Sequence, residues 1–357
     1  MSTEETTIGE LLAEQLERLF SREVDRERIV AVEQGRFDRA LWDALEEIGV
    51  RLALAPEEAG GVGLTWEEAE PALRTAGEWA APVPLGETMI AAWALGRAGL
   101  EIPDGPVALA EEIMALDEGG RVSGSASLVP WLSQCDYLLV VARQNQSTHL
   151  CLMDRQSLEL SAVDTLARIP SSRVQCHKAT PIDFAEIGDL VGELGLLPHI
   201  ATLRTVQMAG LLDRLLSLCV EYGNDREQFG RPIGKFQAVQ HMIAEMASQA
   251  AAARVAGLYA CRQVDRNRAI QGATVAKART GPAATRGAEA AHQVFGAIGF
   301  TDEHILHYYS RRLWQWRSEG GSENWWAERL GREVLAAGGE KLWPHITAPA
   351  TADGEDS

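Results

Sequence analysis

The spacing of apolar residues changes twice along this chain, and that change limits the folds it can adopt. From Ile8 to about Leu100, apolar residues recur with the periodicity of one face of an α-helix. Between about Val107 and Asp189 they form short runs punctuated by Gly, Asp, Gln and Ser, which predicts strands. From about Leu190 to Gly338 helical spacing returns, with alanine-rich stretches. The sequence therefore predicts a mainly α protein with an inserted β domain.

These three blocks define the expected domains. An N-terminal helical domain should cover residues 1–103, a small β domain 104–189, and a helical domain 190–346. The tail, 347–357, is small and acidic and is expected to be disordered. Thr65 is the predicted N-cap of a helix in the first domain, with Glu68 completing a capping box. Five runs are the expected strands: Val122–Leu128, Tyr137–Ala142, His149–Met153, Leu158–Val163 and Val174–Lys178.

Charge and composition exclude several classes of function. A formal net charge of −18 over 357 residues disfavours nucleic acid as the main ligand, although a local basic patch could still receive an anion. The N-terminus is acidic and amphipathic, unlike a signal peptide, and no apolar run reaches the length of a membrane span. Five scattered cysteines fit a reducing compartment, so the expected location is cytoplasmic: Cys135, Cys151, Cys176, Cys219 and Cys261.

The stretch Asn224–Met246 concentrates chemistry between two helical segments. It predicts helix, turn, helix, with Pro232 starting the second helix. Arg226 offers a fork of donors suited to a pyrophosphate or a carboxylate, and Phe229 offers a flat ring. Gln228 and Gln237 add amides that can donate and accept. An anionic, aromatic cofactor would suit this set, while the alternative is an ordinary helix corner with a surface arginine.

Three motifs in this chain resemble those of the acyl-CoA dehydrogenases. Arg226–Gly230, followed by Phe236-Gln237, is similar to the family's R-x-x-F-G turn and F-Q helix. Ala55–Leu64 resembles P-E-x-x-G-G-x-G-L, and Gln293–Phe300 resembles Q-x-x-G-G-x-G-F. They occur in the family's order and span most of the chain. The resemblance implies an N-terminal helical domain, a middle β-barrel or sheet domain, and a C-terminal four-helix bundle.

The resemblance also implies FAD as cofactor, lying between the β domain and the bundle with part of its site from a neighbouring subunit. Arg226, Gln228, Phe229 and Gln237 would face its adenine, ribose and pyrophosphate. Gln293, Gly296 and the adjacent turn at Ala297 would take the same region from another subunit. The alternative for that second motif is a helix C-cap and tight turn, with Gly296 and Gly299 needed only for positive φ.

The family's reaction, dehydrogenation of an acyl-CoA thioester to the 2,3-enoyl-CoA, needs a carboxylate base. Glu319, in Ser318–Glu323, falls where the family places a glutamate in a Y-E-G-T turn, so it is the candidate base. Serine and glycine replace the aromatic and the threonine, and an exposed acidic loop is the alternative. Some relatives place the base near His199, where this chain has no carboxylate. His199 itself could in principle act as a base, and a structural role at a helix start is the alternative. The resemblance implies an acyl-CoA substrate and an electron-transfer flavoprotein as electron acceptor.

The β domain differs from the family pattern at two positions, and these differences suggest a second functional hypothesis. Ala110 and Pro130 stand where the family has hydroxyl residues that meet the flavin ring. This pattern resembles the shorter subunits of bacterial heterotetrameric acyl-CoA dehydrogenases, some acting on steroid side chains. The chain is therefore expected to be either a self-sufficient homo-oligomeric enzyme or a non-catalytic subunit completing a partner's FAD site. A helical interaction protein without cofactor is the third alternative.

Two further groups of residues, a histidine pair and four tryptophans, are expected to have structural rather than functional roles. His304 and His307, near Glu303, are more suited to hydrogen bonding at a helix start than to a metal site, because no third ligand cluster accompanies them. Four tryptophans could line an acyl pocket but are expected to pack the bundle or a subunit interface: Trp314, Trp316, Trp325 and Trp326.

Overall fold

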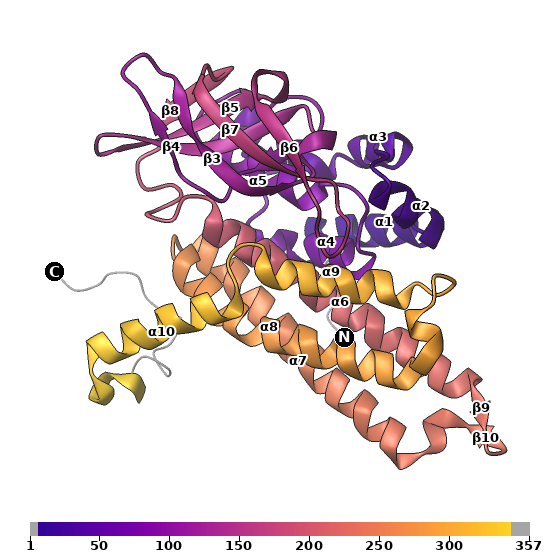
Figure 1. Ribbon diagram of the computed structural model, residues 1–357. Coiled ribbons are helices and arrows are strands. Elements are labelled where there is room, and N and C mark those ends of the chain that lie inside the picture. The colour runs from indigo at the N-terminus through magenta and orange to yellow at the C-terminus, as the bar shows by residue number, and fades with distance from the viewer. Residues whose placement is uncertain (1–5, 344–357) are drawn as a thin grey trace.

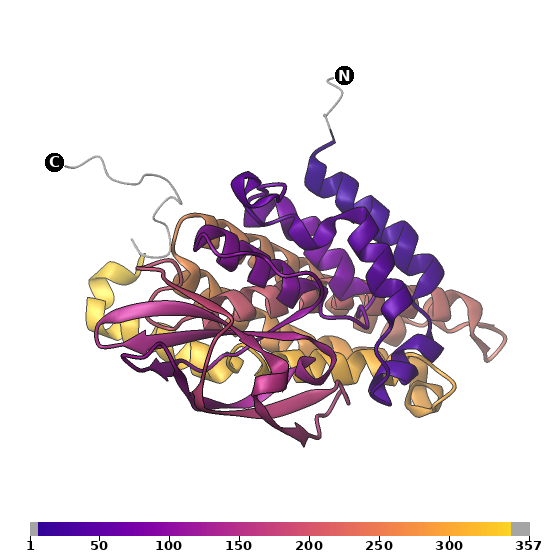
Figure 2. The same ribbon diagram turned by 90° about the horizontal axis from the view of Figure 1, so that it is seen from above.

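The computed structural model, which describes residues 6–343, has the three-part architecture expected from the sequence (Figure 1). A group of helices begins the chain, a β domain follows, and long helices complete it. The two helical parts pack side by side, and the β domain covers the end where they meet (Figure 2). The predicted tail, 347–357, lies outside the described residues.

The N-terminal part contains α1 (Ile8–Glu23), α2 (Arg26–Glu33), α3 (Arg39–Ile48), α4 (Trp66–Glu78) and α5 (Leu85–Arg97). The capping box at Thr65 is confirmed, since its hydroxyl accepts from the Glu68 N–H and the Glu68 carboxylate accepts from the Thr65 N–H. A second cap comes from far along the chain: the Asp265 carboxylate accepts the N–H groups of Trp66 and Glu67, at 2.8 and 2.9 Å. The start of α4 is thereby joined to the C-terminal helices.

Among the described residues, eight strands form one sheet in the order β6-β7-β3-β2-β4-β5-β8, with β1 also paired to β4. The five predicted strands are present as β3 (Val122–Pro130), β4 (Tyr137–Gln144), β5 (Ser147–Asp154), β6 (Glu159–Val163) and β7 (Ser171–Ala179). The sequence did not reveal β1 (Val107–Leu109), β2 (Met114–Leu116) or β8 (Asp183–Glu186). These strands have three or four residues, too few to display an alternating pattern.

The C-terminal part contains α6 (Leu197–Asp225), α7 (Gln237–Asp265), α8 (Ala269–Phe295), α9 (Leu306–Ser318) and α10 (Glu323–Ala337). Helices α6, α7 and α8 pack on one another, and α4 packs on α6. Close approach of α4 and α6 depends on Gly210, where a Cβ would lie 2.1 Å from the Arg74 carbonyl oxygen. None of the described helices is both long enough and apolar enough to cross a bilayer.

Pro232 does not start the long helix, contrary to the prediction; it precedes a single 3₁₀ turn, Ile233–Lys235, that separates it from that helix. It lies in a short hairpin of β9 (Glu227–Gln228) and β10 (Arg231–Pro232), and α7 begins only at Gln237. The hairpin forms because Phe229 and Gly230 both take positive φ, 52° and 78°, as the central residues of a tight two-residue turn require. Pro232 is extended, with ψ at 137°.

Candidate functional site

The predicted site residues fall into two groups at opposite ends of the long helix α6. Glu319 contacts Arg204, in the second turn of the helix, whereas Arg226 is its C-cap. At 1.5 Å per residue, positions 204 and 226 are about 33 Å apart along the axis. A single monomer therefore does not gather both groups into one pocket.

The first group occupies the hairpin tip and the start of α7. Arg226, Gln228, Phe229 and Gln237 are all exposed, and Phe229 is 91% exposed. Among the described residues, the Arg226 side chain makes no ion pair. The tip presents an aromatic ring and an arginine side chain outward, in a protein whose formal net charge is −18.

The rings behind the tip hold its shape. Phe229 meets Phe236 edge to face at 6.2 Å, and the Arg231 guanidinium lies over the Phe236 ring at 4.3 Å. The Ile233 N–H donates to the Arg226 carbonyl at 2.8 Å and closes the base of the hairpin. An outward-facing ring and guanidinium on a braced turn can contact an anionic, aromatic molecule.

The second motif lies at the same end of the bundle. Gln293, Gly296 and Ala297 are exposed at the end of α8, beside the tip-bearing end of α6 because Tyr222 stacks on Phe295 at 4.3 Å. Gly296 has φ 62°, as expected for a helix cap. Gly299 does not have positive φ: its glycine is needed because a Cβ would lie 2.7 Å from Leu306 Cδ2.

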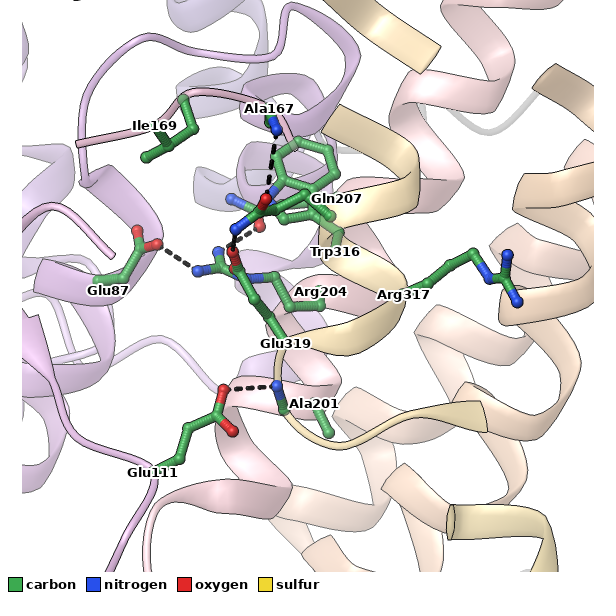
Figure 3. A network of polar contacts seen from close by, with 12 residues as sticks. Glu87, Glu111, Ala167, Ile169, Ala201, Arg204, Gln207, Trp316, Arg317 and Glu319 are labelled. Atoms are coloured by element: carbon green, nitrogen blue, oxygen red, sulfur yellow. Dashed lines mark hydrogen bonds and ion pairs between the residues drawn. The ribbon is translucent and has the colours of Figure 1, made fainter. Parts of the chain in front are cut away.

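Glu319, by contrast, is buried at the C-terminal end of α9, with 4% of its surface exposed. Its Oε2 lies 2.6 Å from Nε of Arg204, and both residues are labelled in Figure 3. Its Oε1 accepts a hydrogen bond from Gln315 Nε2 at 2.7 Å. The Arg204 contact is an ion pair rather than a directed hydrogen bond, since the Nε–H does not point at that oxygen. The exposed acidic loop considered from the sequence is wrong, because the carboxylate is enclosed.

Arg204 is the centre of this enclosed group. Its guanidinium also donates to Glu87 Oε1 and to Gln207 Oε1, both at 2.7 Å, and the residue is 2% exposed. Burial by itself lowers the pKa of Arg204, but Glu319 and Glu87 outweigh it and hold the pKa above its usual value. The arginine thus stays charged between two carboxylates.

A second set of contacts fixes the turn that follows Glu319. Lys277 Nζ donates to the carbonyls of Trp316, Arg317 and Glu319 at 2.8–2.9 Å, and burial lowers the pKa of this lysine to about 7. Glu111 of the β domain accepts the Gly320 N–H at 2.6 Å, and burial raises the pKa of that carboxyl to about 7.

Polar groups of the β domain that the resemblance would assign to the flavin ring are used internally. The Ala110 N–H donates to the Leu139 carbonyl at 3.0 Å, and the Ser127 N–H and hydroxyl both donate to Glu112. Pro130 has no N–H to offer. The next N–H, of Trp131, donates to the Pro170 carbonyl at 2.6 Å. These β-domain groups are therefore not free to contact a flavin ring.

Aromatic packing also fills the space beside α9. The buried Arg312 guanidinium lies 5.6 Å from the Trp131 ring and 5.5 Å from Trp316, while Trp326 donates to the Gly320 carbonyl at 2.7 Å. Trp325 is partly exposed and packs edge-on against Trp326. These tryptophans pack the interior and its margin.

The remaining histidine candidate, His199, is 2% exposed and lies against Trp66 and Trp93. Burial lowers its pKa to about 4, so it is a neutral packing residue at neutral pH. Within residues 6–343, no three His, Cys, Asp or Glu side chains are grouped so as to hold a metal ion.

The residues that enclose Glu319 and its turn were not evident from the sequence: Arg204, Glu87, Gln315, Glu111 and Lys277. One signal was available. Arg204 stands alone in the apolar stretch from Ile200 to Leu212, and Lys277 stands in an alanine-rich stretch of α8. A lone charge on a helix that must be buried requires an opposite charge or carbonyl groups nearby.

Comparisons with known proteins were consistent across sequence and structure. The profile of "Acyl-CoA dehydrogenase, C-terminal domain" matches residues 195–335. Acyl-CoA dehydrogenase IpdE2 of Mycobacterium tuberculosis is 29% identical over 279 residues, covering 77% of this chain and 80% of the relative. Acyl-CoA dehydrogenase FadE27 of the same organism is 27% identical over 340 residues, covering 84% and 89%. The crystal structure of the ChsE4-ChsE5 complex from Mycobacterium tuberculosis matches with a TM-score of 0.84 at 25% identity, covering 94% of this chain and 99% of the other.

Proposed function

Because this chain belongs to the acyl-CoA dehydrogenase family, we propose that it is the non-catalytic subunit of a two-chain acyl-CoA dehydrogenase. In this role it completes the FAD site of a paralogous partner, and its own Glu319 does not act as a base. The observation that carries the proposal is the enclosed contact between Arg204 and Glu319.

A catalytic base must come within hydrogen-bond reach of the substrate proton that it removes. Oε1 of Glu319 accepts a hydrogen bond from Gln315, and Oε2 forms an ion pair with Arg204, so the carboxylate is engaged by protein groups. Glu319 is thus held in place by its structural contacts.

The hairpin tip supports the other half of the proposal. Arg226 and Phe229 face outward, about 33 Å along α6 from the enclosed carboxylate, so a dinucleotide bound there extends away from this chain. When bound, FAD accepts the two electrons of the dehydrogenation. Arg226 would hold its pyrophosphate and Phe229 would stack on its adenine, with Gln293 and Gly296 on the adjoining turn.

The partner supplies the base and the flavin-ring contacts in this scheme. The whole assembly would oxidise an acyl-CoA thioester to the 2,3-enoyl-CoA and pass electrons to an electron-transfer flavoprotein. Assembly with a paralogue is supported by two solved relatives that pair different chains, the ChsE4-ChsE5 complex and the Tcur3481-Tcur3483 steroid ACAD, the latter at 25% identity and a TM-score of 0.82.

The test is purification of the chain alone and with a co-expressed paralogue, followed by flavin absorbance and acyl-CoA-dependent bleaching. We expect a colourless protein alone and a yellow complex together. Bleaching of the complex should survive Glu319→Gln in this chain, while Arg226→Ala should lower its flavin content. Arg18→Ala, at a residue with a 78% exposed side chain on α1, is the matched control.

The same experiment decides for the second candidate, a self-sufficient dehydrogenase with Glu319 as base. A yellow preparation of this chain alone, bleached by an acyl-CoA and unresponsive after Glu319→Gln, would establish that enzyme and overturn the partner role.

A further inference from the structure

Three histidines surround the turn between α8 and α9, which follows the Gln293–Ala297 surface. His292 lies in the last turn of α8, and His304 and His307 lie on either side of the start of α9. The side chains of His292 and His304 are instead positioned by hydrogen bonds.

His304 is an acceptor in this structure. Its Nδ1 accepts the N–H of Leu306, the first residue of α9, at 3.1 Å. The first N–H groups of a helix have no carbonyl partner within the helix, and the Leu306 N–H is one of them. His304 therefore acts as a capping side chain for α9. An imidazole nitrogen accepts only when it carries no proton, which places the proton of neutral His304 on Nε2.

The same ring connects the turn to the hairpin end of the bundle. His304 packs on Phe295 at 4.6 Å, and Phe295 stacks on Tyr222, four residues before the Arg226 cap. His292 reinforces the arrangement: its Nε2 lies 2.8 Å from the Ser310 hydroxyl, and its ring stacks on Phe300 at 4.2 Å. The turn is thus held from both helices by neutral rings.

We propose that this turn is a pH-sensitive clasp: neutral His304 fixes the start of α9 and the Gln293–Ala297 surface, and protonation of His304 releases both. A protonated imidazole cannot accept the Leu306 N–H. It would also place a positive charge at the N-terminus of α9, where the helix dipole is already positive.

The direction of the pH effect follows from burial. Burial lowers the pKa of His304, and likewise that of His292 and of His307. A histidine whose folded pKa lies below its unfolded value of about 6.5 contributes stability that is full above pH 6.5 and is lost as the pH falls toward the folded pKa. The clasp is closed at neutral pH and opens in acid.

The charged groups near His307 have opposite effects on its pKa, and the net shift remains downward. Asp302 lies 3.6 Å from His307 Nε2 and raises its pKa, whereas Arg311 lowers it. Arg311 itself is paired with Glu33, and Arg26 of α2 donates to the Asp302 carbonyl at 2.8 Å. Glu303 is the chain neighbour of His304.

The clasp is tested by hydrogen exchange of peptides covering residues 296–310, corrected for intrinsic rates, at pH 7.5 and 5.5. In the wild type we expect opening to become about fivefold more frequent at pH 5.5, the loss of one helix cap. His304→Asn keeps an acceptor that does not titrate, so its opening should change less between the two pH values than that of the wild type, and only through His292 and His307. His304→Ala should open at both pH values as the wild type does in acid.

Two results would overturn the clasp: equal pH dependence in the wild type and His304→Asn, or a neutral His304 that carries its proton on Nδ1 in ¹⁵N-histidine spectra. The effect on a partner rests on the proposed function, but the exchange is measured on this chain alone. Flavin content of a co-expressed complex at both pH values then tests the partner separately.

Discussion

The Nε atom of Arg204 and the Oε2 atom of Glu319 lie 2.6 Å apart, joining α6 to the end of α9 across the interior of the protein. Both side chains are at most 3% exposed. Each has a further partner, Glu87 for the arginine and Gln315 for the glutamate. The carboxylate that the family resemblance offers as a base is therefore tied to a buried guanidinium.

Removal of the buried cation should be costly. Arg204→Leu leaves Glu87 and Glu319 in the interior without a guanidinium, and we expect it to lower the free energy of unfolding by about 3–5 kcal/mol. Urea denaturation measures the change. The matched control is Arg262→Leu, which removes an exposed pair with Glu67 and should cost about 1 kcal/mol or less. Equal losses in the two variants would contradict the buried network.

The Glu111 carboxyl should impose a pH dependence on stability. Its folded pKa is raised to about 7, so the stabilisation that it gives is full below its unfolded pKa and is lost as the pH rises through 7. Glu111→Gln keeps an oxygen for the Gly320 N–H and does not titrate. The wild type should therefore lose about 1–3 kcal/mol relative to this variant between pH 4.5 and 7.5, measured by urea denaturation. If the wild type and Glu111→Gln showed the same dependence of unfolding free energy on pH, Glu111 would not be its source.

Gly320 should be intolerant of alanine for two separable reasons. It has φ 68°, and a Cβ there would lie 2.6 Å from the Cα of Ala201. Gly35 has φ 85° with no atom within 4 Å of its virtual Cβ, so Gly35→Ala measures backbone strain alone, about 1–2 kcal/mol. Gly320→Ala should lower the melting temperature by several degrees more than Gly35→Ala. If Gly320→Ala and Gly35→Ala lowered the melting temperature equally, the backbone of α6 at Ala201 would have to move to accommodate the added methyl group, and the predicted clash would be wrong.

Phe229→Ala should separate binding from folding. The side chain is 91% exposed, so the free energy of unfolding should change by no more than about 0.5 kcal/mol. In a co-expressed complex the loss of stacking on adenine should weaken flavin retention about tenfold. Val255→Ala, at a residue 70% exposed on α7, controls for the loss of surface apolar area. Unchanged retention would remove Phe229 from the proposed flavin site.

Much of the fold followed from local patterns, because helices α6, α7 and α8 have lengths at which periodicity is clear and Thr65 has a capping box. The site residues differ in this respect. Arg226 and Phe229 belong to one turn, so a local motif describes them, and their role in binding FAD stays a prediction. The environment of Glu319 depends on Glu87 and Arg204, which lie more than one hundred positions away in the chain. No local pattern states which distant side chains will meet, although the lone Arg204 in an apolar helix signals that some must.

Arg204 also constrains the routes by which this sequence can change over generations. Glu87 and Glu319 both depend on the single guanidinium of Arg204. A substitution that removes Arg204 therefore leaves both buried carboxylates without a cationic partner. Substitutions at Arg204, Glu87 and Glu319 therefore have coupled, non-additive effects on stability, and none of the three can be exchanged independently of the others.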